Sequence, residues 1–151
     1  MNVKIKDIMI EQVMTATPHQ TFAHVKSVLT KNKGNCLPVV GPDLEPIGII
    51  TAADLLGDHA DNQPISQFMS KKVFTVPSTS DVSLAARIMR KHHIHHVVVT
   101  DKNAVVGMVS AYDLLQLVED HRFVMKNPPD VSQKKKGGQR RKELLSEAGE
   151  A

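Results

Sequence analysis

The chain has 151 residues, of which 41% are hydrophobic and 23% are charged, with a formal net charge of +3. This apolar content is sufficient for a buried core and excludes a wholly disordered protein. No apolar run approaches the roughly 18 residues that a membrane-spanning helix needs.

The basic excess is confined to the C-terminal part of the chain. Residues 1–125 carry 12 basic and 12 acidic side chains, whereas residues 126–151 carry seven basic and four acidic ones. The expected folded body is therefore not a general nucleic-acid-binding surface. The N-terminus has no apolar signal region, and the single cysteine, Cys36, cannot form an intrachain disulfide. Both observations favour a cytoplasmic protein.

Hydrophobic periodicity in the first half of the chain predicts a small unit of strands and helices. The predicted elements are a lead-in over residues 1–12 that ends in a short helix, an extended stretch over 13–17, a helix ended by Gly34, strands over 37–40 and 46–50, and a helix from Thr51 to about Leu56.

The same order of elements returns about 60 residues later. It comprises a lead-in over residues 65–70, an extended stretch over 73–76, a helix with Ser80 as its N-cap and Asp81 in its first turn, strands over 97–100 and 105–109, and a helix from Ala111 to about Val124. The last helix is expected to point its apolar side chains inward, namely Leu114, Leu115, Leu117 and Val118. One unit of this size buries little surface by itself, so we expect the two copies to pack sheet to sheet around one shared core.

The chain therefore divides into residues 1–60 as the first copy with its lead-in, 61–125 as the second copy, and 126–151 as a tail. The tail has few apolar residues and a basic run between Lys134 and Lys142, so we expect it to be disordered. It could be a solvated extension, or an arm for nucleic acid or an acidic protein. Because the basic run lacks aromatic residues, any nucleic-acid binding would be weak and nonspecific.

Two short motifs occur in both copies, and a third occurs in the first copy. Each copy closes on Gly, two hydrophobic residues, Thr or Ser, two further residues and Asp, over residues 48–54 and 107–113. A Val-x-Thr stretch ends at Thr15 and again at Thr75, and Leu-Pro-Val lies at 37–39. Together, over roughly residues 5–124, these motifs resemble the CBS domain, and two copies in tandem resemble a CBS pair, or Bateman module.

The resemblance implies an α+β fold of two β-α-β-β-α repeats about a pseudo-twofold axis. It implies adenosine-type ligands (AMP, ADP, ATP or S-adenosylmethionine) in clefts between the repeats, and regulation rather than catalysis. A homodimer is implied as well. With no effector domain in the sequence, we expect the module to act in trans on an unknown partner protein.

The closing motif suits such a ligand. Thr51 lies at a strand-to-helix junction, where free backbone N–H groups favour phosphate. Asp54 could accept two hydrogen bonds from a ribose diol, and Gly48 would let a ligand approach the strand. The second copy repeats this set with Ser110, Asp113 and Gly107. Adenine would stack among apolar side chains near Thr15 and Thr75.

The alternative is that Thr/Ser-x-x-Asp only caps a helix. The preceding strand and glycine, present in both copies, favour a ligand role in at least one cleft, and we favour Ser110 and Asp113.

Four histidines lie within five residues, at positions 92, 93, 95 and 96. The first two follow a helix and the last two alternate along a strand, so they are not expected to converge on a metal. Instead, we expect His95 or His96 to line the second cleft, and their counterparts Asn35 and Cys36 to line the first. The two clefts would then differ in ligand preference.

The folded body contains no glycine-rich phosphate loop, nucleophile–base arrangement or paired carboxylates, so we do not expect an enzyme. Two other interpretations stay open: a structural dimerisation module with empty clefts, and an adaptor that acts through the basic tail.

Overall fold

The computed structural model describes residues 3–32 and 34–119, which belong to one compact unit. The predicted disordered tail over residues 126–151 lies outside the described residues, as does the last part of the final predicted helix. Among the helices described, none is both long and apolar enough to cross a membrane.

The first repeat forms a two-stranded sheet covered by a helix. Helix α2 (Phe22–Lys31) precedes strands β1 (Cys36–Val40) and β2 (Pro46–Thr51), which pair antiparallel. The predicted extended stretch over residues 13–17 joins this sheet only through one parallel bridge, between Ala16 and Val39. The repeat closes with the short 3-10 helix η1 (Asp54–Leu56).

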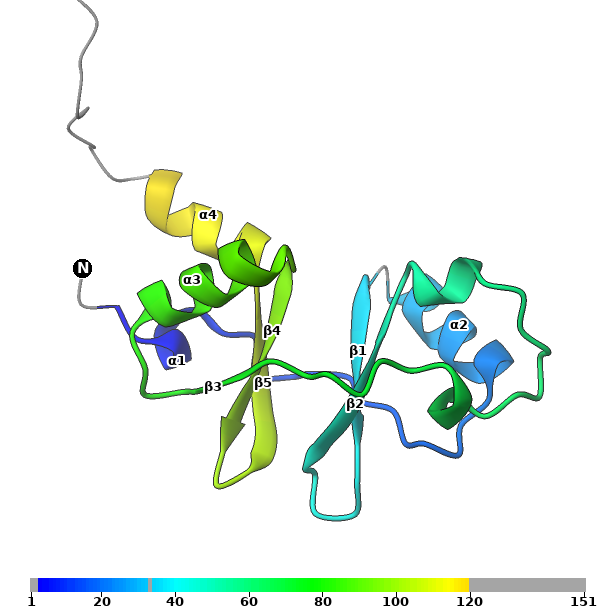
Figure 1. Ribbon diagram of the computed structural model, residues 1–151. Helices are drawn as coiled ribbons and strands as arrows, with labels where there is room; N and C mark the ends of the chain where they lie inside the picture. Colours follow the sequence, from blue (N-terminus) through cyan, green and yellow to red (C-terminus); the bar gives the residue numbers. More distant parts are fainter. Residues whose placement is uncertain (1–2, 33, 120–151) are drawn as a thin grey trace, which may run out of the picture. The chain divides into compact units, whose positions relative to one another are not determined.

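The second repeat has the same plan with a larger sheet. Its elements are β3 (Thr75–Pro77), α3 (Val82–His92), β4 (His96–Asp101), β5 (Ala104–Ser110) and α4 (Ala111–Glu119). The strand order is β3-β4-β5, with β3 parallel to β4 and β4 antiparallel to β5. Figure 1 shows the two repeats with their helices on the outer sides of the sheets. The predicted α+β fold of two similar repeats is confirmed.

Each lead-in packs against the other repeat. In α1 (Ile5–Ile8), the N–H of Ile5 donates to the carbonyl of Ser80 at 2.9 Å. In the 3-10 helix η2 (Ile65–Gln67), the N–H of Ile65 donates to the carbonyl of Gln20, also at 2.9 Å. Both isoleucine side chains are fully buried. The two repeats are therefore joined by an exchange of their N-terminal segments.

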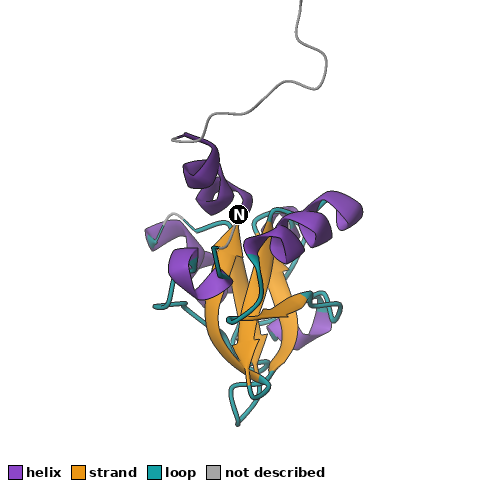
Figure 2. Cartoon of the chain, turned by 90° about the vertical axis from the view of Figure 1, so that its left-hand side faces the viewer, coloured by secondary structure: helices purple, strands orange, loops and turns teal. Residues whose placement is uncertain are grey.

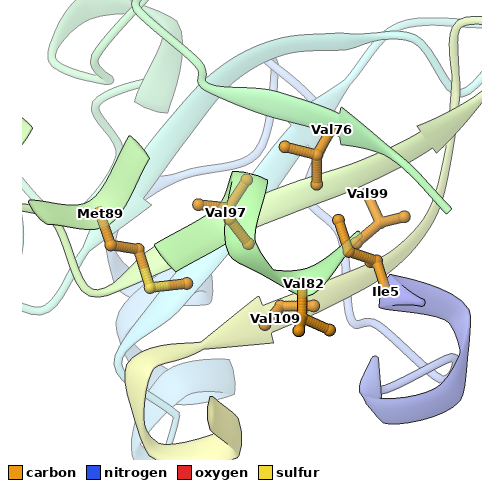
Figure 3. Packing of buried hydrophobic residues seen from close by; sticks show 8 residues of the cluster. Ile5, Val76, Val82, Met89, Val97, Val99 and Val109 are labelled. Carbon is orange, nitrogen blue, oxygen red and sulfur yellow. The ribbon is translucent and has the colours of Figure 1, made fainter. Parts of the chain in front are cut away.

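Most of the buried hydrophobic residues form two clusters rather than the single shared core that was expected. One cluster belongs to the second repeat and includes Ile5; Figure 3 shows it around Val97, Val99 and Val109. The other belongs to the first repeat and includes Ile65. Each repeat can hold its own core because the lead-in of the other repeat adds apolar surface to it.

Three local expectations are corrected. The helix predicted after Thr51 is only the 3-10 turn η1, because the chain turns away at Gly57 after two leucines. The N-cap of α3 is Asp81, whose carboxylate accepts the N–H of Ser83 at 2.9 Å, and not Ser80. On α4, Leu115 and Val118 are 59% and 50% exposed rather than inward-facing.

The two repeats also touch through their hairpins. The N–H of Val105, at the start of β5, donates to the carbonyl of Leu44 in the β1–β2 turn at 2.9 Å. Viewed from the side, the strands lie in the middle with helices around them (Figure 2). The opposite ends of β2 and β5, where the closing motifs lie, also have residues of both repeats around them.

Candidate functional site

Two clefts lie between the repeats, and we name each after the carboxylate that lines it. The Asp113 cleft has a volume of about 640 Å³ and the Asp54 cleft about 570 Å³. Both lie within the range of about 300–1,000 Å³ that is typical of small-molecule sites. Each cleft takes its closing motif from one repeat and part of its wall from the other.

In the Asp113 cleft, Ser110 and Asp113 form a reciprocal capping pair. The N–H of Ser110 donates to Asp113 Oδ2 at 2.8 Å, and the N–H of Asp113 donates to Ser110 Oγ at 3.1 Å. Asp113 is buried, with 7% of its surface exposed. Within the described residues, no hydrogen bond engages Oδ1, and no buried side-chain oxygen or nitrogen lacks a partner. Oδ1 has no hydrogen-bond partner among the described residues and can accept a hydrogen bond from a ligand.

In the Asp54 cleft, the same motif is bonded differently. The N–H and the hydroxyl of Thr51 both donate to Asp54 Oδ2, at 2.8 Å and 3.1 Å. The Thr51 hydroxyl proton is thus committed to the carboxylate, whereas the Ser110 hydroxyl accepts and keeps its proton for another partner. The two closing motifs are equivalent in position but not in hydrogen-bonding capacity.

Two backbone N–H groups at each strand-to-helix junction are already bonded within the protein. Those of Thr51 and Ser110 donate to the carboxylates. The next N–H groups, of Ala52 and Ala111, donate to the carbonyls of Asn35 and His95, at 2.9 Å and 2.8 Å. In addition, η1 is too short to act as a helix dipole. These four N–H groups are therefore not available to an anion, and the anion site expected at the two junctions stays a prediction.

One wall is common to both clefts. It consists of Asn35, Cys36, His95 and His96. Cys36 lies opposite Thr51 in the β1–β2 ladder, and His96 lies opposite Ser110 in the β4–β5 ladder. The prediction that these residues line the clefts is thus supported by their positions, but their expected division between the two clefts is wrong.

The predicted glycines and threonines of the site lie elsewhere. A Cβ on Gly48 would come within 2.5 Å of Met69 Sδ, and one on Gly107 within 2.7 Å of Met9 Sδ. Both glycines therefore make room for the methionine of a lead-in rather than for a ligand. Thr15 and Thr75 are exposed and line neither cleft.

The sequence reasoning missed the segments that precede these threonines. Ser70, Lys72 and Phe74 line the Asp54 cleft. Their counterparts sixty residues earlier line the Asp113 cleft, namely Ile10, Gln12 and Met14. The constant spacing between the copies was the available signal, because each set alternates along an extended segment and so faces one side.

Burial affects the ionisation of two residues in the shared wall. Burial, reinforced by the neighbouring His95, lowers the pKa of His96, while Asp113 opposes that shift. His96 is therefore neutral at pH 7. Burial and the nearby Asp54 carboxylate raise the pKa of the Cys36 thiol to about 12, so this cysteine is an unreactive thiol.

In the part of the chain that the structure describes, no three His, Cys, Asp or Glu side chains are grouped so that they could hold a metal ion. The clefts therefore offer hydrogen-bonding and apolar groups to an organic ligand.

The comparison with family models gives two matches. The model of the CBS domain matches residues 5–59 and again residues 65–120. Among curated proteins, the CBS domain-containing protein YhcV of Bacillus subtilis is 29% identical over 115 residues, which cover 73% of this chain and 81% of YhcV. The uncharacterized protein MJ1232 of Methanocaldococcus jannaschii is 27% identical over 120 residues, covering 78% of this chain. This chain spans only 40% of the length of MJ1232.

A solved structure is similar over most of the described chain. It is the CBS domain pair of protein MJ0100 in complex with 5′-methylthioadenosine and S-adenosyl-L-methionine. The sequence identity is 28% and the TM-score is 0.72, with 79% of this chain and 98% of that chain covered.

Proposed function

The chain belongs to the CBS domain family, with two CBS domains in tandem, and from this premise we propose that it is a regulatory module that binds an adenosine-type ligand. The ligand occupies one or both of the Asp113 and Asp54 clefts. The bound state is read by a partner protein, and the module itself carries out no chemistry.

One observation carries the proposal: the Asp113 cleft contains a buried carboxylate with one oxygen committed to Ser110 and the other without a hydrogen-bond partner among the described residues. A carboxylate oxygen is a suitable acceptor for the hydroxyls of a ribose. The similar CBS pair of MJ0100 is in complex with two ligands that each contain a ribose and an adenine.

The other lining residues suit the remaining parts of such a ligand. The Ser110 hydroxyl has a proton to donate. Met14, Val28 and Met108 offer an apolar surface for adenine in the Asp113 cleft, and Phe74 offers an aromatic face in the Asp54 cleft. AMP, ADP, ATP and S-adenosylmethionine are the candidate ligands.

Ligand binding would act by population shift. Both clefts lie between the repeats, so a ligand that contacts both walls favours the relative arrangement in which those walls fit it. The shift is limited by the difference in affinity for the two arrangements. A partner protein that prefers one arrangement then responds to the ligand.

The first test is a thermal-shift panel of AMP, ADP, ATP, S-adenosylmethionine and NADH. A ligand at 100 times its Kd stabilises the folded state by about 2.7 kcal/mol, which is a shift of several degrees for a domain of this size. Asp54→Asn and Asp113→Asn are the matched variants, because asparagine keeps an acceptor for the cap but loses the charge. If none of these compounds raises the Tm of the wild-type protein, the proposal is wrong.

A second proposal concerns self-association. Helix α4 exposes Tyr112, Leu115 and Val118, which are 79%, 59% and 50% exposed. These positions are three residues apart and so lie along one side of the helix, which suits packing against the same helix of a second copy. Leu115→Glu is expected to convert a homodimer into a monomer in light scattering. A monomeric wild-type protein would contradict this proposal.

The adaptor alternative rests on residues 126–151, which lie outside the described residues. Nucleic-acid binding that survives deletion of these residues would contradict it.

A further inference from the structure

The segment before β3 lines the Asp54 cleft, and the equivalent segment sixty residues earlier lines the Asp113 cleft. These two segments differ in charge. Lys72 lines the Asp54 cleft, and the equivalent position in the Asp113 cleft is Gln12. Of the described residues that line the Asp113 cleft, none is Lys or Arg. Among the described residues, the permanent positive charge at a cleft wall is thus that of Lys72 in the Asp54 cleft.

The ammonium group of Lys72 is held at this wall by an aromatic contact. Its Nζ lies over the ring of Phe74, 5.3 Å from the centroid. The ring of Phe74 also packs against that of His92, with the two centroids 4.2 Å apart. Phe74 itself lines the cleft. Such a cation–π contact restrains a lysine that would otherwise move freely in solvent.

The Asp113 cleft has a different set at the same places. Met14 stands where the other cleft has Phe74, and Ile10 where it has Ser70. Tyr112, where the first repeat has Ala53, adds an exposed aromatic ring. Among the described residues that line the Asp113 cleft, the one fully charged group is the buried carboxylate of Asp113, which repels a phosphate and tolerates a neutral or cationic group.

We propose that the Asp54 cleft takes the phosphate-bearing adenosine ligand, with Lys72 as the group that binds the phosphate, and that the Asp113 cleft takes an adenosine ligand without phosphate. This inference rests on the proposed function, because it assigns ligand classes to the two clefts of that function. In both clefts the carboxylate holds the ribose, so the two ligands differ at the 5′ position.

The test compares AMP with 5′-methylthioadenosine, two ligands with the same adenosine moiety that differ at the 5′ position by phosphate or methylthio. Isothermal titration measures both on the full chain, with Asp54→Asn and Asp113→Asn identifying the cleft. Asp54→Asn is expected to weaken AMP selectively, and Asp113→Asn to weaken 5′-methylthioadenosine selectively. Lys72→Gln is expected to lower the preference for AMP over 5′-methylthioadenosine about tenfold, as for one charge-assisted hydrogen bond at a partly exposed site.

The reciprocal change is Gln12→Lys, which gives the Asp113 cleft the missing charge. It is expected to add AMP binding that Asp113→Asn removes. Lys71→Gln is the matched control, because Lys71 is exposed and lines neither cleft. Lys33, outside the described residues, is changed to Gln in a separate variant so that its charge is not mistaken for that of Lys72.

Three outcomes would overturn the inference. The first is an unchanged ligand preference in Lys72→Gln, the second an equal loss of preference in Lys71→Gln or Lys33→Gln, and the third a loss of AMP binding in Asp113→Asn alone. In each of these cases adenosine ligands still bind, so the proposed function stands. If neither ligand binds the wild-type protein, the inference and the proposed function both fail.

Discussion

His96 and Ser110 lie opposite each other in the antiparallel β4–β5 ladder, so an imidazole and a hydroxyl line the Asp113 cleft from adjacent strands. Directly opposite residues share one face of a sheet. The half-buried imidazole is therefore close to the Ser110–Asp113 pair, and its ionisation affects both stability and the charge of the cleft.

Stability is expected to fall in mild acid because of His96. Burial and His95 lower its pKa in the folded protein below the ordinary value of 6.5. As the pH falls through 6.5, the unfolded chain takes up a proton that folded His96 takes up only at lower pH, so the free energy of unfolding decreases. Above that pH the stabilisation is fully present. Urea denaturation at pH 7.5 and 5.5 measures the difference.

The control separates His96 from the other histidines. His96→Gln is expected to reduce the loss of stability between the two pH values, and His95→Gln, at an exposed position, to reduce it less. An identical pH dependence in His96→Gln and wild type would rule out this role.

Removal of the Asp113 side chain is expected to cost stability by itself. Asp113→Ala deletes the acceptor for the Ser110 N–H at the start of α4, and the loss of such a cap costs about 1 kcal/mol. Asp54→Ala is expected to cost less, because Asp54 is less buried and the η1 turn that begins with it has only three residues. Urea denaturation would measure both, and recovery in Asp113→Asn would identify the cap as the cause. A larger loss in Asp54→Ala would contradict the structure.

The two closing glycines are expected to matter for packing. A Cβ on Gly107 would meet Met9 Sδ at 2.7 Å and the backbone oxygen of Ile10 at 3.0 Å, whereas a Cβ on Gly48 would meet only the flexible side chain of Met69. Overpacking of this kind costs roughly 1–3 kcal/mol. Gly107→Ala should therefore destabilise more than Gly48→Ala in thermal unfolding. A loss of ligand affinity without any loss of stability would instead place these glycines in the binding site.

The exchanged lead-ins are expected to be essential for both cores. Ile5→Ala and Ile65→Ala each truncate a fully buried side chain, and such changes cost about 2–5 kcal/mol. Each variant removes a contact between a lead-in and the other repeat. Native-state hydrogen exchange should thus show reduced amide protection in the β3-β4-β5 sheet of Ile5→Ala. In Ile65→Ala the reduced protection should lie in the β1-β2 sheet. The reverse pattern would contradict the exchange.

Much of the fold was predictable from the sequence, because β1, β2, β4 and β5 are apolar runs separated by turn residues and the whole pattern occurs twice. The pairing of Ser110 with Asp113 is also local, since the residues are three positions apart. The packing partner of Ile5 was not predictable. A four-residue helix has an apolar face, but its sequence does not indicate which of two similar repeats covers that face.

The shared wall of the clefts was not predictable for the same physical reason. Asn35 and His95 lie at equivalent positions in the two repeats. Each residue lines both clefts only because of how the two repeats pack together. The role of Gly48 and Gly107 is not evident from the sequence, because a glycine near a binding motif can make room either for a ligand or for a protein side chain such as methionine. Their Cβ positions, which face Met69 and Met9, distinguish the two.

The most direct measurement of the central claim is isothermal titration of AMP and 5′-methylthioadenosine into the wild-type chain and the double variant Asp54→Asn/Asp113→Asn. We expect at least one of the two ligands to bind the wild type, and its affinity to fall by about tenfold or more in the double variant, as for the loss of a charged hydrogen-bond partner. Urea denaturation of the same variant should show that it is folded. Equal affinity in the double variant, or no binding to the wild type, would contradict the account.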